Sequence, residues 1–285
     1  MVTGPREALR SVQQAGDRST RASPVRKLAR AGYFARGFVY AVIGALALRV
    51  AIGAGGATTD SRGAIATVGR APFGKVLVLA LAVGLAGMAL WMLVEAIGDP
   101  ERRRRSGLWG AASRIGQAIA ALGYVGLAVA ALRVGFGGSA GPSGNRAAQA
   151  YTARVLELPG GRWLVLAAAA VVAFLGGRQI WFGLRRTFLE KLDVAAMSAP
   201  LRRWASSLGT AGLAAQGIVF VLVGGFFAVA AIRHSSREAT GFDGALAAIA
   251  RQPSGKTLLL AMSLGLLAYA AYSVIEGRHR KLGGG

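Results

Sequence analysis

The chain has 285 residues, of which 54% are hydrophobic and only 16% are charged, and its formal net charge is +22. A soluble protein of this length needs many more polar residues to cover its surface, so the composition excludes an ordinary soluble domain. The positive charge is compatible with nucleic-acid binding, but Lys and Arg also accumulate in the cytoplasmic loops of membrane proteins.

The first 25 residues are polar, contain Gly4, Pro5, Gly16 and Pro24, and lack the apolar core of a cleavable signal peptide. We expect residues 1–25 to form a disordered cytoplasmic leader. The first membrane span would then direct insertion itself.

Six apolar stretches of about 20 residues follow the leader. A helix rises about 1.5 Å per residue, so each stretch is long enough to cross the hydrocarbon core of a bilayer. We predict membrane-spanning helices over residues 33–52, 76–97, 115–134, 163–184, 208–232 and 257–275. The sequence therefore predicts an all-α, polytopic membrane protein with six transmembrane helices.

One unit occurs three times: an apolar stretch, a polar loop ending in Pro-x-Gly-Lys or Pro-Gly-Gly-Arg, and a second apolar stretch. The first and third copies align at Gly32 and Gly212, Gly37 and Gly217, Tyr40 and Phe220, Gly44 and Gly224, Pro72 and Pro253, and Glu95 and Glu276. The middle copy keeps Gly116 and Tyr124 but has Phe182 in place of the glutamate. We expect units at residues 26–101, 107–192 and 201–281, each a helical hairpin in the same orientation around a pseudo-threefold axis.

Basic residues gather on one side of the predicted membrane: in the leader, after the second and fourth spans, and in the tail. Loops rich in Lys and Arg stay in the cytoplasm, so both termini are expected there. We expect these loops to contact anionic lipid headgroups of the bilayer, and we expect no nucleic-acid partner.

The three loops on the opposite side carry short amphipathic patterns. In the first loop, Asp60 or Ser61 can cap a helix that ends at Gly69. The expected apolar residues are Ala64, Ile65 and Val68 in the first loop, Ala147, Ala148, Tyr151, Val155 and Leu156 after Asn145 in the second, and Ala245, Leu246 and Ile249 after Asp243 in the third. Such helices either lie on the outer interface or plug the mouth of the bundle.

Gly37 and Gly44 are seven residues apart and share one helix face, and Gly217 and Gly224 repeat this spacing. Small residues let helix backbones approach closely in lipid, so we expect these four glycines at helix-packing interfaces. The alternative is that they line a lumen or form a hinge.

The candidate polar residues lie near the ends of spans. Arg36 near the start of the first span and Glu95 near the end of the second fall at a similar depth and could pair. The third unit keeps the acid as Glu276 and has Gln216 in place of the arginine, and Gln179 is a further polar position. We interpret Arg36, Glu95, Gln216 and Glu276 as a candidate intramembrane polar pair or path, with a structural ion pair or snorkelling as the alternative.

No catalytic, cofactor-binding or metal site is expected. His234 and His279 lie beyond the ends of spans without carboxylate partners at useful spacing, and cysteine is absent. Phosphate-binding and nucleophile-elbow motifs are missing, which argues against an enzyme. The tryptophans near predicted interfaces indicate an aromatic belt: Trp91, Trp109, Trp163, Trp181 and Trp204.

The segments Ala31–Tyr40 and Pro72–Lys75, followed by Gly84, Leu85 and Trp91, resemble the repeat of bacterial integral membrane proteins catalogued as domain of unknown function 1206. The resemblance covers roughly residues 26 to 280. It implies three tandem two-helix units in a bacterial membrane, and it implies no particular activity.

Three functions are consistent with these features. The first is a non-enzymatic scaffold or envelope-associated protein of the bacterial cytoplasmic membrane, favoured because polar residues lie at the span edges. The alternative is a small-solute, ion or lipid permease with a path along the repeat axis, lined by the first, third and fifth spans. The third is a membrane enzyme acting on a lipid. A polar cavity on the axis supports the permease, and glycine-packed helices without a cavity support the scaffold.

Overall fold

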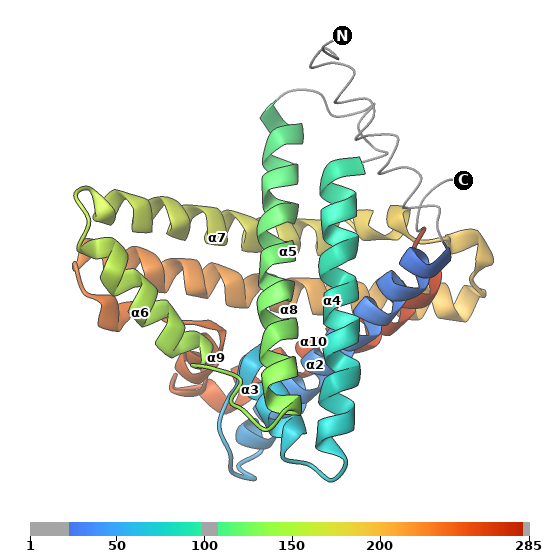
Figure 1. Cartoon of the computed structure of the whole chain (residues 1–285), viewed down its shortest axis with the longest axis horizontal. Coiled ribbons are helices and arrows are strands. Elements are labelled where there is room, and N and C mark those ends of the chain that lie inside the picture. The colour runs from blue at the N-terminus through green and yellow to red at the C-terminus, as the bar shows by residue number, and fades with distance from the viewer. Residues whose placement is uncertain (1–22, 99–107, 282–285) are drawn as a thin grey trace.

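The computed structural model describes residues 23–98 and 108–281 (Figure 1). Within these ranges every regular element is a helix, apart from one isolated bridge between Leu192 and Arg280. The all-α prediction is therefore confirmed. Most of the expected leader, residues 1–22, lies outside the described ranges, as does the basic run Arg102–Arg105.

Six long helices form the body of the molecule: α2 (Ser23–Ala51), α4 (Gly74–Gly98), α5 (Leu108–Gly135), α7 (Gly161–Leu184), α8 (Ala199–Ile232) and α10 (Gly255–His279). Each is long and apolar enough to cross a membrane. The six helices therefore indicate a multi-pass membrane protein.

Two of these helices begin well before the apolar stretches that predicted them. Helix α2 begins at Ser23, ahead of the predicted residue 33, and α8 begins at Ala199, ahead of residue 208. In α8, Ser198 is the N-cap residue and Pro200 lies in the first turn, where a missing backbone N–H costs no hydrogen bond. Hydropathy marks only the part of a helix suited to hydrocarbon, and these helices continue beyond it.

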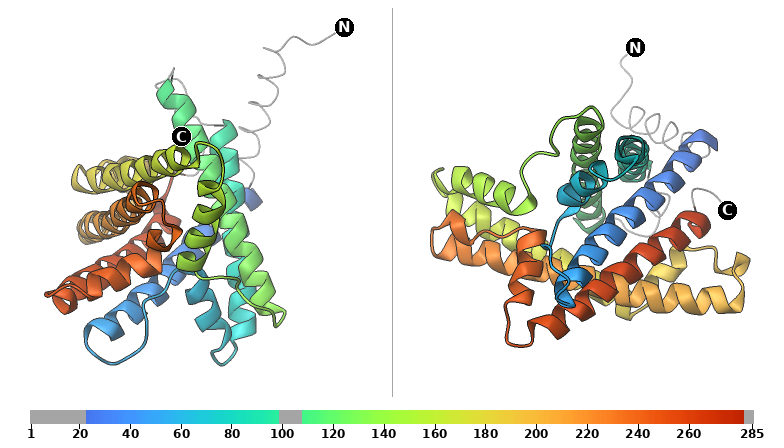
Figure 2. Two further views of the ribbon diagram at one scale, coloured as in Figure 1. Left: turned by 90° about the vertical axis from the view of Figure 1, so that its left-hand side faces the viewer. Right: turned by 90° about the horizontal axis from the view of Figure 1, so that it is seen from below.

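The tightest helix pairs join neighbouring units. Helix α4 packs along α5, α7 along α8, and α10 returns to pack along α2. These three pairs run in different directions through the molecule (Figures 1 and 2). Within the units, α2 contacts α4 and α8 contacts α10, but α5 and α7 barely touch. Each unit therefore packs against both of the others, as expected for a threefold arrangement. The pseudo-threefold axis itself stays a prediction.

Close helix contact occurs at all four predicted glycines. A Cβ atom on Gly37 would lie 2.9 Å from the carbonyl oxygen of Ala270 on α10, and one on Gly44 would lie 2.9 Å from Leu267. On α8, a Cβ on Gly217 would lie 2.6 Å from the oxygen of Gly176, and one on Gly224 would lie 2.8 Å from the oxygen of Ala169. These glycines therefore lie at the α2–α10 and α7–α8 interfaces, where only a bare backbone fits.

The loop between the two long helices of each unit contains a short helix: α3 (Ser61–Gly69), α6 (Gly144–Leu156) and α9 (Phe242–Ala250). Asp60 caps α3 as predicted, accepting a hydrogen bond from the Gly63 N–H at 2.9 Å. The predicted apolar residues of α3 and α9 are buried in the main hydrophobic core between the long helices. These two helices therefore plug the bundle. In the second loop, Tyr151 is exposed and the buried residues are Thr152 and Leu156.

The three short helices are tied together at their N-terminal ends. The Gly144 N–H donates to Asp60 Oδ2 at 2.7 Å, and the Gly241 N–H donates to Asn145 Oδ1 at 3.2 Å. The Thr58 hydroxyl donates to the Asp243 carbonyl at 2.9 Å. Each bond joins a different pair of units, so the three bonds close a ring, which we call the loop ring.

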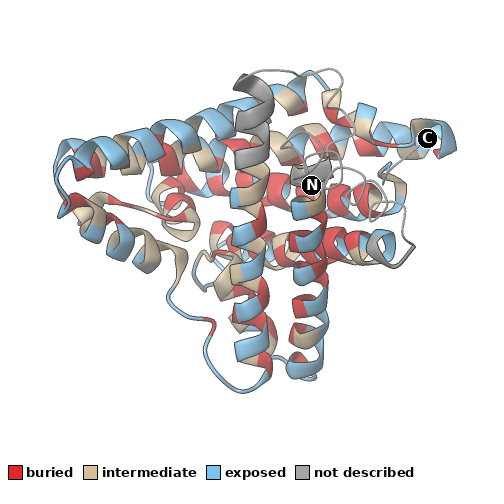
Figure 3. Ribbon diagram, turned by 45° about the horizontal axis from the view of Figure 1, so that its top comes forward, coloured by how far each residue is buried: buried red, intermediate tan, exposed pale blue. Residues whose placement is uncertain are grey.

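Buried residues line the faces that the helices turn toward one another (Figure 3). The outward faces are rich in apolar side chains. Ile119 and Leu122 on α5, and Phe174 on α7, are more than half exposed. Exposed side chains of this kind suit contact with lipid tails.

Candidate functional site

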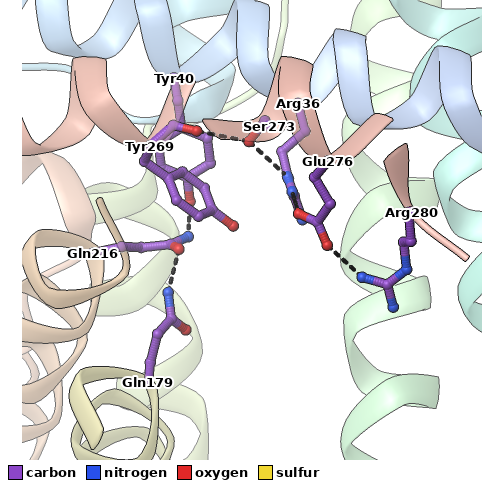
Figure 4. A network of polar contacts seen from close by, with 8 residues as sticks. All are labelled: Arg36, Tyr40, Gln179, Gln216, Tyr269, Ser273, Glu276 and Arg280. Atoms are coloured by element: carbon purple, nitrogen blue, oxygen red, sulfur yellow. Dashed lines mark hydrogen bonds and ion pairs between the residues drawn. The ribbon is translucent and has the colours of Figure 1, made fainter. Parts of the chain in front are cut away.

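An ion cluster joins the first and last long helices. Arg36 on α2 donates from Nη2 to Glu276 Oε2 on α10 at 2.5 Å, and from Nε to Ser273 Oγ at 3.3 Å (Figure 4). Arg280, one turn beyond Glu276, donates to the other carboxylate oxygen. Arg36 and Glu276 are both more than nine-tenths buried. The Glu276 carboxylate is thus held between two guanidinium groups.

Aromatic rings surround the same cluster. The Arg36 guanidinium lies 4.9 Å from the ring centre of Tyr33 and 5.1 Å from that of Tyr269. Arg280 lies 5.1 Å from the Tyr33 ring. A desolvated cation over an aromatic face gains about 2 kcal/mol, which offsets part of the cost of burying the charge.

The structure gives Arg36 a partner that the sequence analysis did not name, while a pairing of Arg36 with Glu95 stays a prediction. Arg36 pairs with Glu276 of the third unit because Gly37 and Gly44 let α2 approach α10 closely. The side chain of Glu95 lies outside the part of the chain that the structure describes. Glycine spacing indicated that α2 has a tight interface, but it did not identify the partner helix.

A second polar chain links all three units. Gln179 on α7 donates from Nε2 to Gln216 on α8, and Gln216 donates from Nε2 to the hydroxyl of Tyr40 on α2. The Tyr40 ring packs edge-on against Tyr269, with 4.8 Å between the ring centres. Gln216 and Gln179 were candidates from the sequence. Tyr40 was noted only as a repeat match, and no sequence signal gave it a polar role.

A partly open cavity of about 330 Å³ is lined by members of both polar groups. Residues from all six long helices line it, together with Ser61 of α3. Its polar lining comprises Arg36, Tyr40, Ser61, Tyr124, Gln179, Gln216 and Tyr269. The rest of the lining is apolar apart from Gly123.

The cavity is lined by matching positions of the three units. Aligning Gly32, Gly116 and Gly212 makes Arg36 equivalent to Ala120 and Gln216, and Tyr40 equivalent to Tyr124 and Phe220. All six of these residues line the cavity. The cavity therefore lies where the equivalent faces of α2, α5 and α8 converge.

A linker covers the end of α10 that carries the ion cluster. It contains the short 3₁₀ helices η2 (Thr187–Lys191) and η3 (Val194–Ala196). The Asp193 N–H donates to the His279 carbonyl at 2.7 Å, and the Lys281 N–H donates to the Lys191 carbonyl at 3.0 Å. These bonds fix the backbone on both sides of Arg280. No periodic pattern in the linker sequence indicated this role.

The remaining predicted positions lie apart from the cavity. Among the described residues, no group of three His, Asp or Glu side chains could hold a metal ion. Trp163, Trp181 and Trp204 are exposed. Trp91 contradicts the belt prediction, because it is 4% exposed and packs with Ala29, Tyr33 and Met88 in a small core. The side chain of Trp109 lies outside the described part.

A family model described as Domain of Unknown Function (DUF1206) matches the chain at residues 31–99, 115–186 and 211–280. The uncharacterized protein YxxB of Bacillus subtilis (strain 168) is 35% identical to the chain over 258 residues, which cover 90% of this chain and 92% of that protein. No solved structure matches the chain. The resemblance inferred from the repeat residues is confirmed, and the chain carries three copies of one family segment.

Proposed function

The chain belongs to the Domain of Unknown Function (DUF1206) family, and we propose that it is a non-enzymatic small-solute permease whose substrate site is the central cavity. The observation that carries this proposal is the lining of the cavity by matching positions of all three units, Arg36 and Gln216 among them. A cavity of about 330 Å³ with a few convergent polar groups on an apolar wall is typical of a small-molecule site.

The placement of the polar groups also favours a path. Buried ionisable groups within membrane spans are costly and usually serve substrate or ion movement. The cavity is lined both by Arg36, near the start of α2, and by Ser61, at the start of the plug helix α3 in the loop after α2. A solute would leave past Ser61 only if the loop ring opened. The loop ring therefore has the position of a gate in this proposal.

We further propose that the protein lies in the bacterial cytoplasmic membrane with both termini in the cytoplasm. Basic residues near the ends of the described spans support this orientation, among them Arg185 and Arg278. Arg185 lies over the exposed Trp181 ring at 4.4 Å, an arrangement suited to the headgroup region. Anionic lipid is the expected partner of this face, and nucleic acid is not.

A scaffold is the second candidate function. Four glycines at close helix contacts support it, as does the largely exposed apolar surface of α7. A scaffold does not require water to enter the cavity, whereas a permease does. Water access to the cavity therefore separates the two functions.

Three consecutive residues of α5 provide a cavity-lining position and two controls for measuring water access. Gly123 lines the cavity, and a Cβ atom there would have nothing within 4 Å. Leu122 is exposed on the outer surface, and Ala121 is buried. The natural chain has no cysteine, so single Cys substitutions at 121, 122 and 123 can be compared in lipid nanodiscs with a membrane-impermeant maleimide.

The permease predicts that Gly123→Cys reacts about tenfold or more faster than Ala121→Cys or Leu122→Cys, because only a hydrated thiol ionises to the reactive thiolate. Equal, slow labelling at all three positions would refute a wet cavity and leave the scaffold as the better function. Thermal unfolding of each variant shows whether the fold is intact.

A further inference from the structure

The open side of the cavity lies on α5. Among the described residues that line the cavity, Gly123 is the exposed one, whereas the others are buried or half-buried. Gly123 lies within the apolar span Gly116–Gly135, seven residues from its nearer end, which is about 10 Å along a helix. The opening therefore faces the interior of the bilayer and neither aqueous side.

Gly123 marks the border between the cavity wall and the outer face of α5. Successive residues of an α-helix are rotated by about 100°, so Ala120 and Leu127, which line the cavity, lie within about 60° of Gly123 on one side. Gly126 and the exposed Ile119 lie within about 60° of it on the other side. A Cβ atom on Gly123 or Gly126 would have nothing within 4 Å, so no neighbouring group closes the border there.

The corresponding border is closed in the other two units. Alignment at Gly32, Gly116 and Gly212 makes Gly123 equivalent to Val39 and Val219, which are 4% and 0% exposed and belong to the main core. Helix α2 also packs on α4, and α8 on α10, whereas α5 and α7 barely touch within the described ranges. The middle unit is therefore the one that opens to the side.

The two sides of the border differ in polarity. The cavity wall has groups that both donate and accept hydrogen bonds, namely the hydroxyls of Tyr40 and Tyr124 and the amides of Gln179 and Gln216. The outer face has exposed apolar side chains such as Leu122. A volume of about 330 Å³ corresponds to a sphere about 9 Å across, whereas one leaflet of hydrocarbon is about 15 Å deep. A bilayer amphiphile therefore fits with its polar head inside the cavity and its acyl chain outside.

We infer that the cavity takes amphiphiles from the bilayer through the opening at Gly123, with a small polar head inside and an acyl chain along the outer face of α5. This inference rests on the proposed permease function and names its substrate class. The same head can also belong to a water-soluble molecule that enters from an aqueous side. The test therefore compares two probes that differ in the chain alone.

N-dodecanoylcysteamine and N-acetylcysteamine carry the same head on acyl chains of different length. We would supply each as its 2-pyridyl disulfide to the full chain in phosphatidylcholine nanodiscs, and measure exchange with a single cysteine by the mass of the protein. Ala120→Cys reports from the cavity wall, and Ala57→Cys reports from an exposed loop. The ratio of the dodecanoyl rate to the acetyl rate should be about tenfold or more higher at Ala120→Cys than at Ala57→Cys, because the chain concentrates the probe in the bilayer.

Gly123→Val gives the middle unit the residue of the other two units and narrows the opening. A Cβ atom there meets nothing within 4 Å, so the fold should tolerate the substitution. Combined with Ala120→Cys, it should slow the reaction with the dodecanoyl probe about tenfold. Gly177→Val on α7 is the matched control, because a Cβ there also meets nothing within 4 Å and Gly177 does not line the cavity. It should leave the rate within about twofold.

An equal rate ratio at Ala120→Cys and Ala57→Cys would overturn the inference, because the guest would then enter from water. So would a dodecanoyl rate that Gly123→Val leaves unchanged in a protein whose thermal unfolding is intact. These failures differ from failure of the permease function. Fast maleimide labelling of Gly123→Cys together with an equal rate ratio would reject the substrate class alone, whereas slow maleimide labelling would reject the path itself.

Discussion

Arg36 Nη2 lies 2.5 Å from Glu276 Oε2, although the two residues are 240 positions apart in the chain. The pair joins the first unit to the third and closes the cyclic order of the helices. Its partner Ser273 lies on α10 and Arg280 directly follows the last residue of that helix, so the cluster is fixed mainly from the end of α10.

Glu276→Gln should destabilise the protein strongly. The substitution removes the Glu276 carboxylate from the buried Arg36 guanidinium, and breaking a buried pair from one side costs about 3–5 kcal/mol. Thermal unfolding in detergent would measure the loss. The double variant Arg36→Gln with Glu276→Gln should recover much of it. Glu238→Gln is the matched control, because it breaks the exposed Arg233–Glu238 pair and should cost less than about 1 kcal/mol. Similar losses in Glu276→Gln and Glu238→Gln would contradict the structure.

Substitution by alanine should change the stability of the protein in opposite directions at two glycines of α8. Gly217→Ala places a methyl group 2.6 Å from the Gly176 carbonyl oxygen, so α7 must move away. Overpacking of this kind typically costs about 1–3 kcal/mol. Gly225→Ala meets nothing within 4 Å and should gain about 0.5–1 kcal/mol from helix propensity. Thermal unfolding of both variants checks the sign, and a stabilising Gly217→Ala would exclude the close α7–α8 contact.

Phe73 lies in the left-handed region with a φ of 60°, and its side chain is largely exposed. The equivalent residue of the middle unit, Gly160, has a φ of 73°. Phe73→Gly should therefore stabilise the protein by about 1 kcal/mol, because glycine adopts this conformation without strain. Gly160→Ala should destabilise it by a similar amount. If Phe73→Gly instead lowers the unfolding temperature in nanodiscs, the aromatic ring contributes more by contact with lipid than it costs in strain.

Asp243 should make stability depend on pH. Burial, and then the nearby charge of Asp60, raise the pKa of the Asp243 carboxyl above its usual value, while backbone N–H groups partly oppose this. One of its oxygens, Oδ1, is buried without a hydrogen-bond partner. A raised folded-state pKa favours the protonated folded form. The stabilising effect is complete below the ordinary Asp pKa of about 3.9 and is lost as pH rises through the raised value.

Asp243→Asn removes this dependence. The variant should gain stability relative to the natural chain as pH rises from 4 to 8, and it should show little gain near pH 4. Unfolding temperatures across that range would measure the difference. Asn is a suitable replacement, because Asn145 occupies the same position of α6. Glu157→Gln, which alters an exposed acid just after α6, is the control for loss of a surface charge. A pH-independent effect of Asp243→Asn would argue against the raised pKa.

The sequence predicted the parts of the fold that depend on local pattern. Apolar length located all six long helices, and the three short helices followed from caps and spacing, as Asp60 and Gly69 illustrate. The partners of the helices could not be predicted in this way, because every apolar face looks alike in lipid. Glu95 was suggested as a partner of Arg36 because both lie at a similar depth, whereas the contact of Arg36 with Glu276 depends on the packing of α2 against α10. Trp91 was misassigned for the same reason, since burial depends on which helix covers it.

The packing of α2 on α10 has a consequence for biogenesis. The ribosome releases α2 into the membrane long before it makes α10, so the Arg36 cation lacks its Glu276 partner until translation is almost complete. A nascent chain arrested before residue 276 should expose that cation to quality-control proteases, which makes arrival of the final span the step that commits the protein to its mature form.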